Sequence, residues 1–183
     1  LFITSGSTGP PKGAVYCHEN FQAQVDGLKA MFDFEPGVDV DLPTFPLFAL
    51  FDPALGMTTI IPRMDATKPA SVDPREIIGP IHKFDVTTMF GSPALLNAVG
   101  RYGEKHDVKL PTIRRVISAG APLPDHVMRR FHAMLGDDAR IFPPYGATES
   151  LPVAMLGSDE ILGETWARTE QGDGVCVGRP VET

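Results

Sequence analysis

Apolar residues recur along this chain either in short runs or at helical spacing, and the two patterns alternate. Short runs rich in β-branched and aromatic residues predict strands at residues 1–3, 58–61, 86–90, 115–118 and 139–142. Helical spacing of apolar positions predicts helices over residues 21–32, 74–84, 94–99 and 124–135. Strands that alternate with helices are typical of right-handed βαβ units. The pattern therefore predicts an α/β fold with a mostly parallel sheet.

The segments that follow the predicted strands are rich in Gly, Pro and Ser. In an open parallel sheet, ligands bind beyond the carboxyl ends of the strands, where such segments gather. We therefore expect the loops after residues 90, 118 and 142 to lie close together. The Pro- and Gly-containing segments 35–46 and 65–73 are predicted to be surface connections.

Composition narrows the class of protein. The 183 residues are 43% hydrophobic and 21% charged, which is typical of a globular domain with a sizeable core. A net charge of −7 disfavours sequence-independent nucleic-acid binding, which depends on Lys and Arg. Two cysteines are too few for a disulfide framework and fit a cytoplasmic location. No apolar run approaches the ~20 residues of a transmembrane helix.

A loop suited to phosphate follows the first predicted strand. Residues 4–13 read T-S-G-S-T-G-P-P-K-G. Glycine lets backbone N–H groups turn toward an anion, and hydroxyl and ammonium groups add further donors. The loop is not a Walker A motif, because Pro11 and Gly13 stand where that motif needs Gly and Ser/Thr. The predicted phosphate-binding residues are Thr4, Ser5, Gly6, Ser7, Thr8, Gly9 and Lys12.

A second candidate segment, Y-G-A-T-E at residues 145–149, follows the strand predicted at 139–142. Tyr145 offers a flat face on which a base can stack. Thr148 and Glu149 offer oxygen atoms suited to phosphate and Mg²⁺. Read alone, the segment is also consistent with an ordinary turn after a strand.

Together and in this order, the two segments resemble the motifs of the acyl-adenylate-forming, or AMP-binding, superfamily. This group includes acyl-CoA synthetases, adenylation domains of peptide synthetases and luciferases. The resemblance implies that Tyr145 packs on adenine beside Gly146, that Thr148 contacts the α-phosphate, and that Glu149 binds Mg²⁺ with Thr8. Lys12, Thr148 and Glu149 would then be the catalytic residues.

Three further segments resemble parts of the same family. Gly120, Ala121 and Pro122 resemble the segment whose main chain lines the nucleotide, and residues 177–180 resemble the V-G-x-P segment. The residues that resemble walls of the acyl pocket are Phe48, Ala49, Phe90, Gly91 and Ser92. Ala49 departs from many relatives, which carry a histidine or another aromatic residue there. Residues 45–65 look closest to the β-lactone synthetases of olefin biosynthesis, which act on 2-alkyl-3-hydroxy fatty acids.

The resemblance implies that ATP and Mg²⁺ activate a hydrophobic carboxylic acid, either fatty or 3-hydroxy fatty, as acyl-AMP. Coenzyme A is a further expected cofactor of the full-length protein if the product is a thioester, and the alternative product is a β-lactone. The resemblance also identifies residues 1–183 as an internal fragment of the large AMP-binding domain, without its N-terminal part and its small C-terminal domain. Such a fragment is not expected to adenylate alone.

Other functions stay open at this point. A peptide-synthetase adenylation domain usually places an aspartate in its pocket, and Asp52 is the only acid in the corresponding stretch. A non-catalytic nucleotide-binding module would keep Tyr145 and the phosphate loop without turnover. A structural or interaction fragment would leave the two phosphate-suited segments unexplained.

Overall fold

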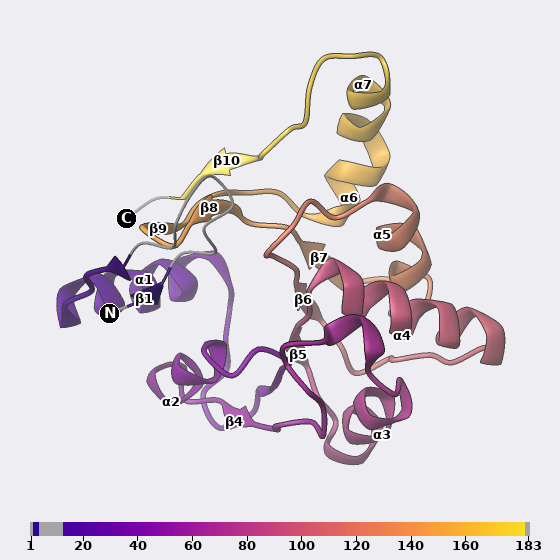
Figure 1. Cartoon of the computed structure of the whole chain (residues 1–183), viewed down its shortest axis with the longest axis horizontal. Helices are drawn as coiled ribbons and strands as arrows, with labels where there is room; N and C mark the ends of the chain where they lie inside the picture. Colours follow the sequence, from indigo (N-terminus) through magenta and orange to yellow (C-terminus); the bar gives the residue numbers. More distant parts are fainter. Residues whose placement is uncertain (1, 4–12, 182–183) are drawn as a thin grey trace.

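A five-stranded sheet of order β4-β3-β5-β6-β7 forms the centre of the protein (Figure 1). The computed structural model describes residues 2–3 and 13–181. Every adjacent pair in this sheet is parallel. Its strands are β3 (Val40–Pro43), β4 (Thr58–Thr59), β5 (Thr88–Phe90), β6 (Arg115–Ile117) and β7 (Arg140–Phe142). The α/β fold with a mostly parallel sheet is thus confirmed.

The main core lies between this sheet and three helices. These are α3 (Arg75–Phe84), α4 (Pro93–His106) and α5 (Asp125–His132), with the short helix η2 (Pro69–Ser71) beside α4. Helix α4 begins where Ser92 accepts a hydrogen bond from the Leu95 N–H and Pro93 occupies the first turn, both common features of a helix start. The core residues include Leu42, Met89, Val116 and Ile141 from the strands and Ile81, Leu96 and Phe131 from the helices.

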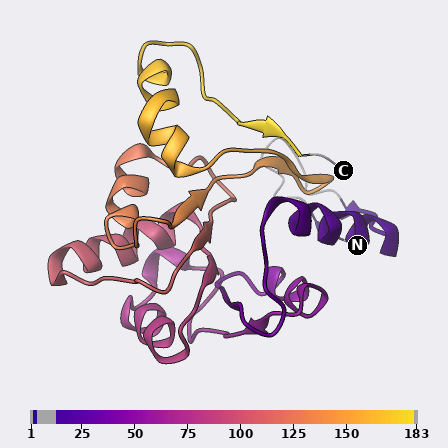
Figure 2. The ribbon, with the colours of Figure 1, turned by 180° about the vertical axis from the view of Figure 1, so that it is seen from behind.

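A smaller apolar cluster joins the N-terminal helix α1 (His18–Met31) to η1 (Phe48–Leu50) and α2 (Asp52–Leu55). The Phe21 and Phe51 rings stack with their centroids 4.8 Å apart, which ties α1 to the start of α2. Helices α1 and α2 lie toward one side of the ribbon and α4 and α5 toward the other, as Figure 2 also shows from behind. The sheet therefore has a different layer on each side.

Strand β3 corrects the prediction that residues 35–46 are a surface connection. It pairs with both β4 and β5, and Asp39, Asp41, Leu42 and Thr44 are all buried. The acidic residues and Pro43 hid the strand, because an interior strand normally has apolar residues at most positions and avoids proline. The burial of Asp39 is possible because Thr87 and Arg115 bond to its carboxylate.

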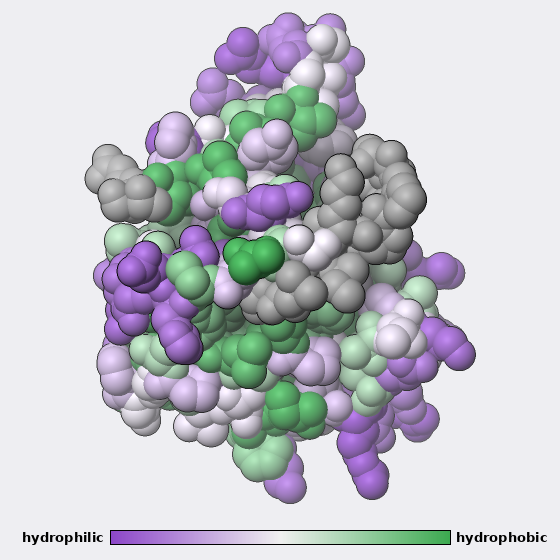
Figure 3. All heavy atoms as spheres, turned by 60° about the vertical axis from the view of Figure 1, so that its left-hand side comes forward, coloured by the Kyte–Doolittle hydropathy of each residue, from purple (hydrophilic) through white to green (hydrophobic). Residues whose placement is uncertain are grey.

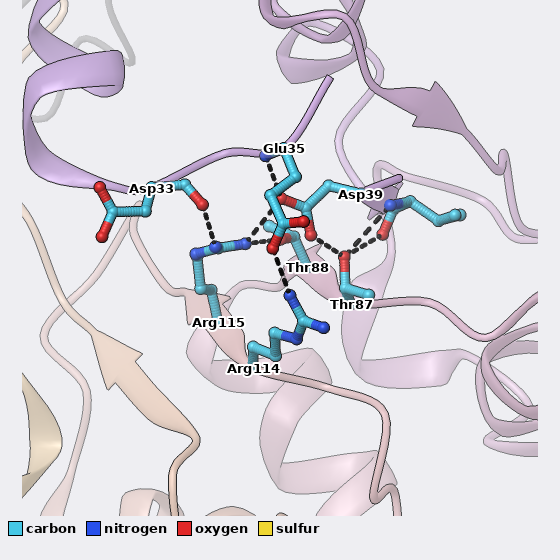
Figure 4. Close-up of polar contacts among 8 residues, drawn as sticks. Asp33, Glu35, Asp39, Thr87, Thr88, Arg114 and Arg115 are labelled. Carbon is cyan, nitrogen blue, oxygen red and sulfur yellow. Dashed lines mark hydrogen bonds and ion pairs between the residues drawn. The ribbon is translucent and has the colours of Figure 1, made fainter. Parts of the chain in front are cut away.

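A polar network joins the amino ends of β3, β5 and β6 (Figure 4). Arg115 Nη1 lies 3.2 Å from Asp39 Oδ2, and the Thr87 hydroxyl donates to Asp39 Oδ1 at 2.6 Å. Arg115 Nη2 also donates to the Asp33 carbonyl at 2.6 Å. Burial by itself would raise the pKa of Asp39, but the hydrogen bonds from Thr87 and Glu35 N–H and the Arg115 charge lower that pKa overall.

A second, three-stranded antiparallel sheet follows the parallel one along the chain. Its strands are β8 (Tyr145–Ala147), β9 (Ser150–Met155) and β10 (Arg179–Pro180), in the order β10-β9-β8. Gly178 precedes β10 with φ +94°, and a Cβ there would lie 2.1 Å from the Met155 carbonyl oxygen. The close approach of β10 to β9 therefore requires glycine.

The remaining elements are short. Strands β1 (Phe2–Ile3) and β2 (Gly13–Ala14) form an antiparallel pair. Helices α6 (Ser158–Glu160), η3 (Ile161–Thr165) and α7 (Trp166–Glu170) connect β9 to the segment that leads to β10. None of the described helices combines the length and the apolar character that crossing a membrane requires.

Candidate functional site

A cavity of about 1640 Å³ opens where the segments after the parallel strands converge. Its walls include residues that follow β3, β5, β6 and β7, such as Thr44, Ser92, Ser118 and Pro143. The prediction that these loops lie together is thus confirmed. The volume exceeds the 300–1,000 Å³ of an ordinary small-molecule pocket, so there is room for two substrates side by side. Figure 3 shows apolar side chains gathered near the middle of the face that carries α1.

The Y-G-A-T-E segment forms a hairpin at the edge of this cavity rather than a simple loop. Tyr145 lies on β8 with 55% of its surface exposed, and Thr148 and Glu149 form the turn to β9. A Cβ on Gly146 would lie 2.7 Å from the Ser150 carbonyl oxygen, so the hairpin needs glycine there. All five residues of the segment line the cavity. The hairpin therefore presents an aromatic face, a hydroxyl and a carboxylate to one space.

Two residues that the sequence analysis missed anchor this hairpin: Tyr16, just before α1, and Gln24, on α1. The Tyr16 hydroxyl donates a hydrogen bond to the Thr148 carbonyl. Gln24 Nε2 donates to the Tyr16 hydroxyl at 3.2 Å and to the Leu151 carbonyl at 3.0 Å. No local pattern signals these roles, because Tyr16 and Gln24 are 132 and 127 residues away from their hairpin partners.

The segment after β6 contributes main chain and one buried hydroxyl. Gly120 has φ +93°, a conformation that favours glycine, and Gly120, Ala121 and Pro122 all line the cavity. The Ser118 N–H donates to the Phe142 carbonyl at 3.0 Å, which holds β6 to β7. Ser118 Oγ is buried on the cavity wall and has no hydrogen-bond partner among the described residues. An unpaired buried hydroxyl at this position suits a polar ligand.

Aromatic side chains form much of the wall on the side of β3 and β5. The Phe48 and Phe90 rings stack with their centroids 4.1 Å apart, and both line the cavity together with Ser92. Ala49 and Gly91 are not among its lining residues. Gly91 instead allows α4 to approach, because a Cβ there would lie 2.9 Å from Leu96 Cδ2. Of the predicted acyl-pocket residues, three thus face the cavity and two do not.

Two buried acids on the same wall were not predicted as a pair. Asp41, on β3, is 6% exposed, and Asp52, at the start of α2, is 3% exposed. The Thr59 hydroxyl donates to Asp52 Oδ2 at 2.6 Å. Burial and the neighbouring Asp52 carboxyl raise the pKa of Asp41 well above its usual range. The alternation of Asp and apolar residues over 38–42 is the one sequence signal that could have revealed Asp41 on a buried strand.

The predicted phosphate loop lies outside the described residues, and so do the calls on Thr4, Ser5, Gly6, Ser7, Thr8, Gly9 and Lys12. Glu149 is exposed and makes no ion pair within residues 13–181. Among the described residues, no group of three or more His, Cys, Asp or Glu side chains could hold a metal ion. Mg²⁺ in nucleotide sites is commonly held by one or two carboxylates together with substrate phosphates. The carboxylate of Glu149, which makes no ion pair among the described residues, fits a site of that kind.

Solved structures with this fold define the class of protein. The chain aligns with O-succinylbenzoate coenzyme A synthetase from Bacillus subtilis, solved with ATP and magnesium ion, at a TM-score of 0.73 and 21% identity. That match covers 99% of this chain and 35% of the synthetase. The N-terminal domain of FACL13 from Mycobacterium tuberculosis aligns at a TM-score of 0.67 and 27% identity, over 87% of this chain and 39% of that one. The fold is thus that of the large domain of adenylate-forming enzymes.

Residues 1–182 match the family described as AMP-binding enzyme, and the chain belongs to that family. The olefin beta-lactone synthetase of Xanthomonas campestris pv. campestris is 50% identical over 181 residues, and that of Stenotrophomonas maltophilia is 51% identical over 181 residues. Each match covers 99% of this chain. The chain spans about a third of these relatives, 32% of the length of each.

Proposed function

We propose that the full-length protein activates a hydrophobic carboxylic acid with ATP, forming an acyl-AMP and releasing pyrophosphate. The observation that carries this proposal is the shared cavity. It joins the hairpin of Tyr145, Thr148 and Glu149 to the aromatic wall of Phe48 and Phe90. A nucleotide on the hairpin side and an acyl chain on the aromatic side would bring a carboxylate and an α-phosphate together.

The chemistry needs positioning and charge stabilisation more than a general base. The carboxylate is already ionised and attacks the α-phosphorus, and pyrophosphate leaves. Negative charge then spreads over the phosphoryl oxygens, so groups that hold and neutralise those oxygens lower the barrier. Tyr145 packs on the base, Thr148 donates to the α-phosphate, and Lys12 places a positive charge near the phosphates. Mg²⁺ held by Glu149, with Thr8, would supply further neutralisation.

The proposed substrate is a long-chain 3-hydroxy acid, and the proposed product is a β-lactone. A β-lactone ring forms when the 3-hydroxyl oxygen attacks the acyl carbon of the adenylate. The bond to AMP then breaks and the hydroxyl proton is released. The identity of 50% and 51% to two olefin beta-lactone synthetases supports this product. The competing product is a coenzyme A thioester. It is favoured by the weaker match to a long-chain-fatty-acid–CoA ligase of Yersinia pestis, which is 26% identical over 199 residues.

The proposal includes a cytoplasmic location, where ATP is available. The two cysteines, Cys17 and Cys176, are both free and exposed, which is consistent with a reducing compartment.

Product analysis tests the proposal directly. The full-length protein is incubated with ATP, Mg²⁺ and a long-chain 3-hydroxy acid, with and without coenzyme A, and products are identified by mass spectrometry. We expect AMP, pyrophosphate and a product lighter than the acid by one water, without a need for coenzyme A. A coenzyme A-dependent thioester would replace the β-lactone with an acyl-CoA ligase function. If neither AMP nor pyrophosphate formed with any long-chain acid, the proposed activation itself would be wrong.

A variant at the hairpin connects that activity to the site. Glu149→Gln keeps the size of the side chain but removes the charge that would hold Mg²⁺. We expect the rate of AMP formation to fall by at least about tenfold, because a charged group at a phosphoryl-transfer site is lost. Glu164→Gln, on the short helix η3, is the matched control and should leave the rate unchanged.

A further inference from the structure

The Asp41–Asp52 pair is a polar spot on an otherwise apolar part of the cavity wall. Asp41 stands in register with Thr59 on β4 and Thr88 on β5, so the three side chains form one row across the sheet. Asp52 reaches this row from α2 through its hydrogen bond with Thr59. The surrounding cavity residues include Phe21, Phe34, Phe51, Leu55 and Met57.

Asp41 has an unused hydrogen-bonding atom. Its Oδ1 is buried and has no partner among the described residues, and Asp41 is one of the residues that line the cavity. Most buried polar atoms in proteins are paired, and an unpaired one costs stability. Directly before this strand, Asp39 is buried to a similar degree but is bonded by Thr87 and Arg115. Burial in this part of the chain therefore does not by itself leave a carboxyl oxygen unpaired.

The pair offers an unpaired acceptor to a ligand. Burial, the Asp52 carboxyl and the nearby charge of Asp39 all raise the pKa of Asp41, and Asp41 and Asp52 share a hydrogen bond. Arg115 is engaged by Asp39 and by the Thr88 hydroxyl at 3.3 Å. A carboxyl oxygen accepts hydrogen bonds, and an alcohol has one hydrogen to donate. Asp41 Oδ1 therefore suits the hydroxyl group of an alcohol.

We propose that Asp41 and Asp52 form a polar subsite that binds the 3-hydroxyl group of the acyl substrate. The subsite would select hydroxylated acids over plain fatty acids of equal length, since a plain chain leaves Asp41 Oδ1 unpaired. This inference rests on the proposed adenylation and specifies which acid that reaction takes. An acidic group on the acyl chain would be disfavoured here, because the pair already carries carboxyl groups. An amine is the competing ligand, and the experiment below includes it.

The test compares three long-chain acids in the full-length protein: a 3-hydroxy acid, the same acid without the hydroxyl, and its 3-amino analogue. Pyrophosphate release gives kcat/KM for each acid, because adenylation precedes ring closure and does not need the hydroxyl. We expect the 3-hydroxy acid to be preferred over the plain acid by roughly tenfold or more, as expected for a site with a buried group that is otherwise unpaired.

Two substitutions at Asp41 separate binding from folding. Asp41→Leu has a similar size but no polar atom, and should abolish the preference for the 3-hydroxy acid while the plain acid reacts at least as well. Asp41→Asn keeps a donor and an acceptor and should retain part of the preference. Asp65→Asn, at an exposed acid on a connecting segment, is the matched control and should behave like the unmodified protein.

The results distinguish a hydroxyl-binding subsite from a purely structural role of the two aspartates. Loss of the hydroxyl preference in Asp41→Leu with partial retention in Asp41→Asn supports the subsite. Equal changes for hydroxylated and plain acids, or no change in either variant, would show that the pair has only a structural role. A preference of the unmodified protein for the 3-amino acid would replace the alcohol by an ammonium ligand. Absence of pyrophosphate release with all three acids would instead mean that the proposed adenylation has failed, and the inference would fail with it.

Discussion

At the amino ends of β3, β5 and β6, buried polar side chains bond to one another, whereas two buried oxygens of cavity-lining residues, Asp41 Oδ1 and Ser118 Oγ, have no partner among the described residues. Asp39 and Asp41 show the contrast best, because they stand two positions apart in the chain, Asp39 directly before β3 and Asp41 on it. Asp39 is held by Thr87 and Arg115 and its pKa is lowered, while Asp41 lacks a partner for Oδ1 and its pKa is raised. Burial is thus compensated by an ion pair and hydrogen bonds at Asp39, and at Asp41 it leaves the oxygen that we propose as a ligand-binding group.

The largest expected loss of stability comes from breaking the network of Asp39, Thr87 and Arg115. Arg115→Ala leaves the Asp39 carboxylate buried without its ion pair, which should lower the free energy of unfolding by about 3–5 kcal/mol. Its neighbour Arg114 pairs with Glu35 at 3.2 Å, but both side chains are more than half exposed, so Arg114→Ala should cost less than about 1 kcal/mol. Urea unfolding of both variants measures the difference. Equal losses would show that the buried network has no special role.

Added volume in the hairpin should lower the stability of the protein nearly as much as the loss of Arg115. Gly146→Ala would place a Cβ 2.7 Å from the Ser150 carbonyl, and we expect about 1–3 kcal/mol of lost stability together with weaker ATP binding. Gly79→Ala is the control, because it lies in the exposed face of α3 with no atom within 4 Å of the added Cβ. That change should stabilise the protein by up to about 1 kcal/mol. Calorimetry of ATP binding and thermal unfolding measure the two effects, and normal ATP affinity in Gly146→Ala would contradict the role of the hairpin.

The pKa shifts of Asp39 and Asp41 predict opposite dependences of the protein's stability on pH. Asp39 has a lowered pKa, so its contribution to the free energy of unfolding is present above the unfolded pKa of about 3.9. That contribution is lost as pH falls through the folded pKa. Asp41 has a raised pKa, so above about pH 3.9 the unfolded state releases a proton that the folded state keeps, and stability falls as pH rises. Asp41→Asn should therefore gain stability over the unmodified protein as pH rises above about 4. Thermal unfolding across pH 4–8 checks this, and a constant difference would contradict the raised pKa.

The smallest expected effect concerns the anchor of the hairpin. Gln24→Ala removes the two hydrogen bonds from α1 to Tyr16 and Leu151, which should cost about 1 kcal/mol and weaken ATP binding a few-fold. Gln22, two residues earlier on the same helix, bonds to the exposed Asp26 at 2.8 Å and to no other side chain in the described part of the chain, so Gln22→Ala should change neither quantity measurably. If both variants bound ATP like the unmodified protein, α1 would not be positioning the hairpin.

Local pattern was enough to predict most of the parallel sheet. The runs at 86–90, 115–118 and 139–142 are apolar and bounded by turn residues, and β5, β6 and β7 lie inside them. The helix predicted over 124–135 ends at His132, since helix ends carry weaker signals than helix interiors. Strand β3 was missed, because a short strand that carries Asp41, follows Asp39 and ends at Pro43 has no apolar run to mark it.

By itself, the sequence determined the alternation of strands and helices, the convergence of the loops, and the order of motifs that indicated the AMP-binding family. These features follow from spacing along the chain, which needs no knowledge of distant contacts. Only the tertiary structure decided that Tyr16, just before α1, and Gln24, on α1, hold the hairpin, and that Asp39 is paired with Arg115 while Asp41 Oδ1 has no partner among the described residues. Those outcomes depend on side chains from distant segments of the chain, which meet only when the sheet assembles and excludes water from the groups between its strands.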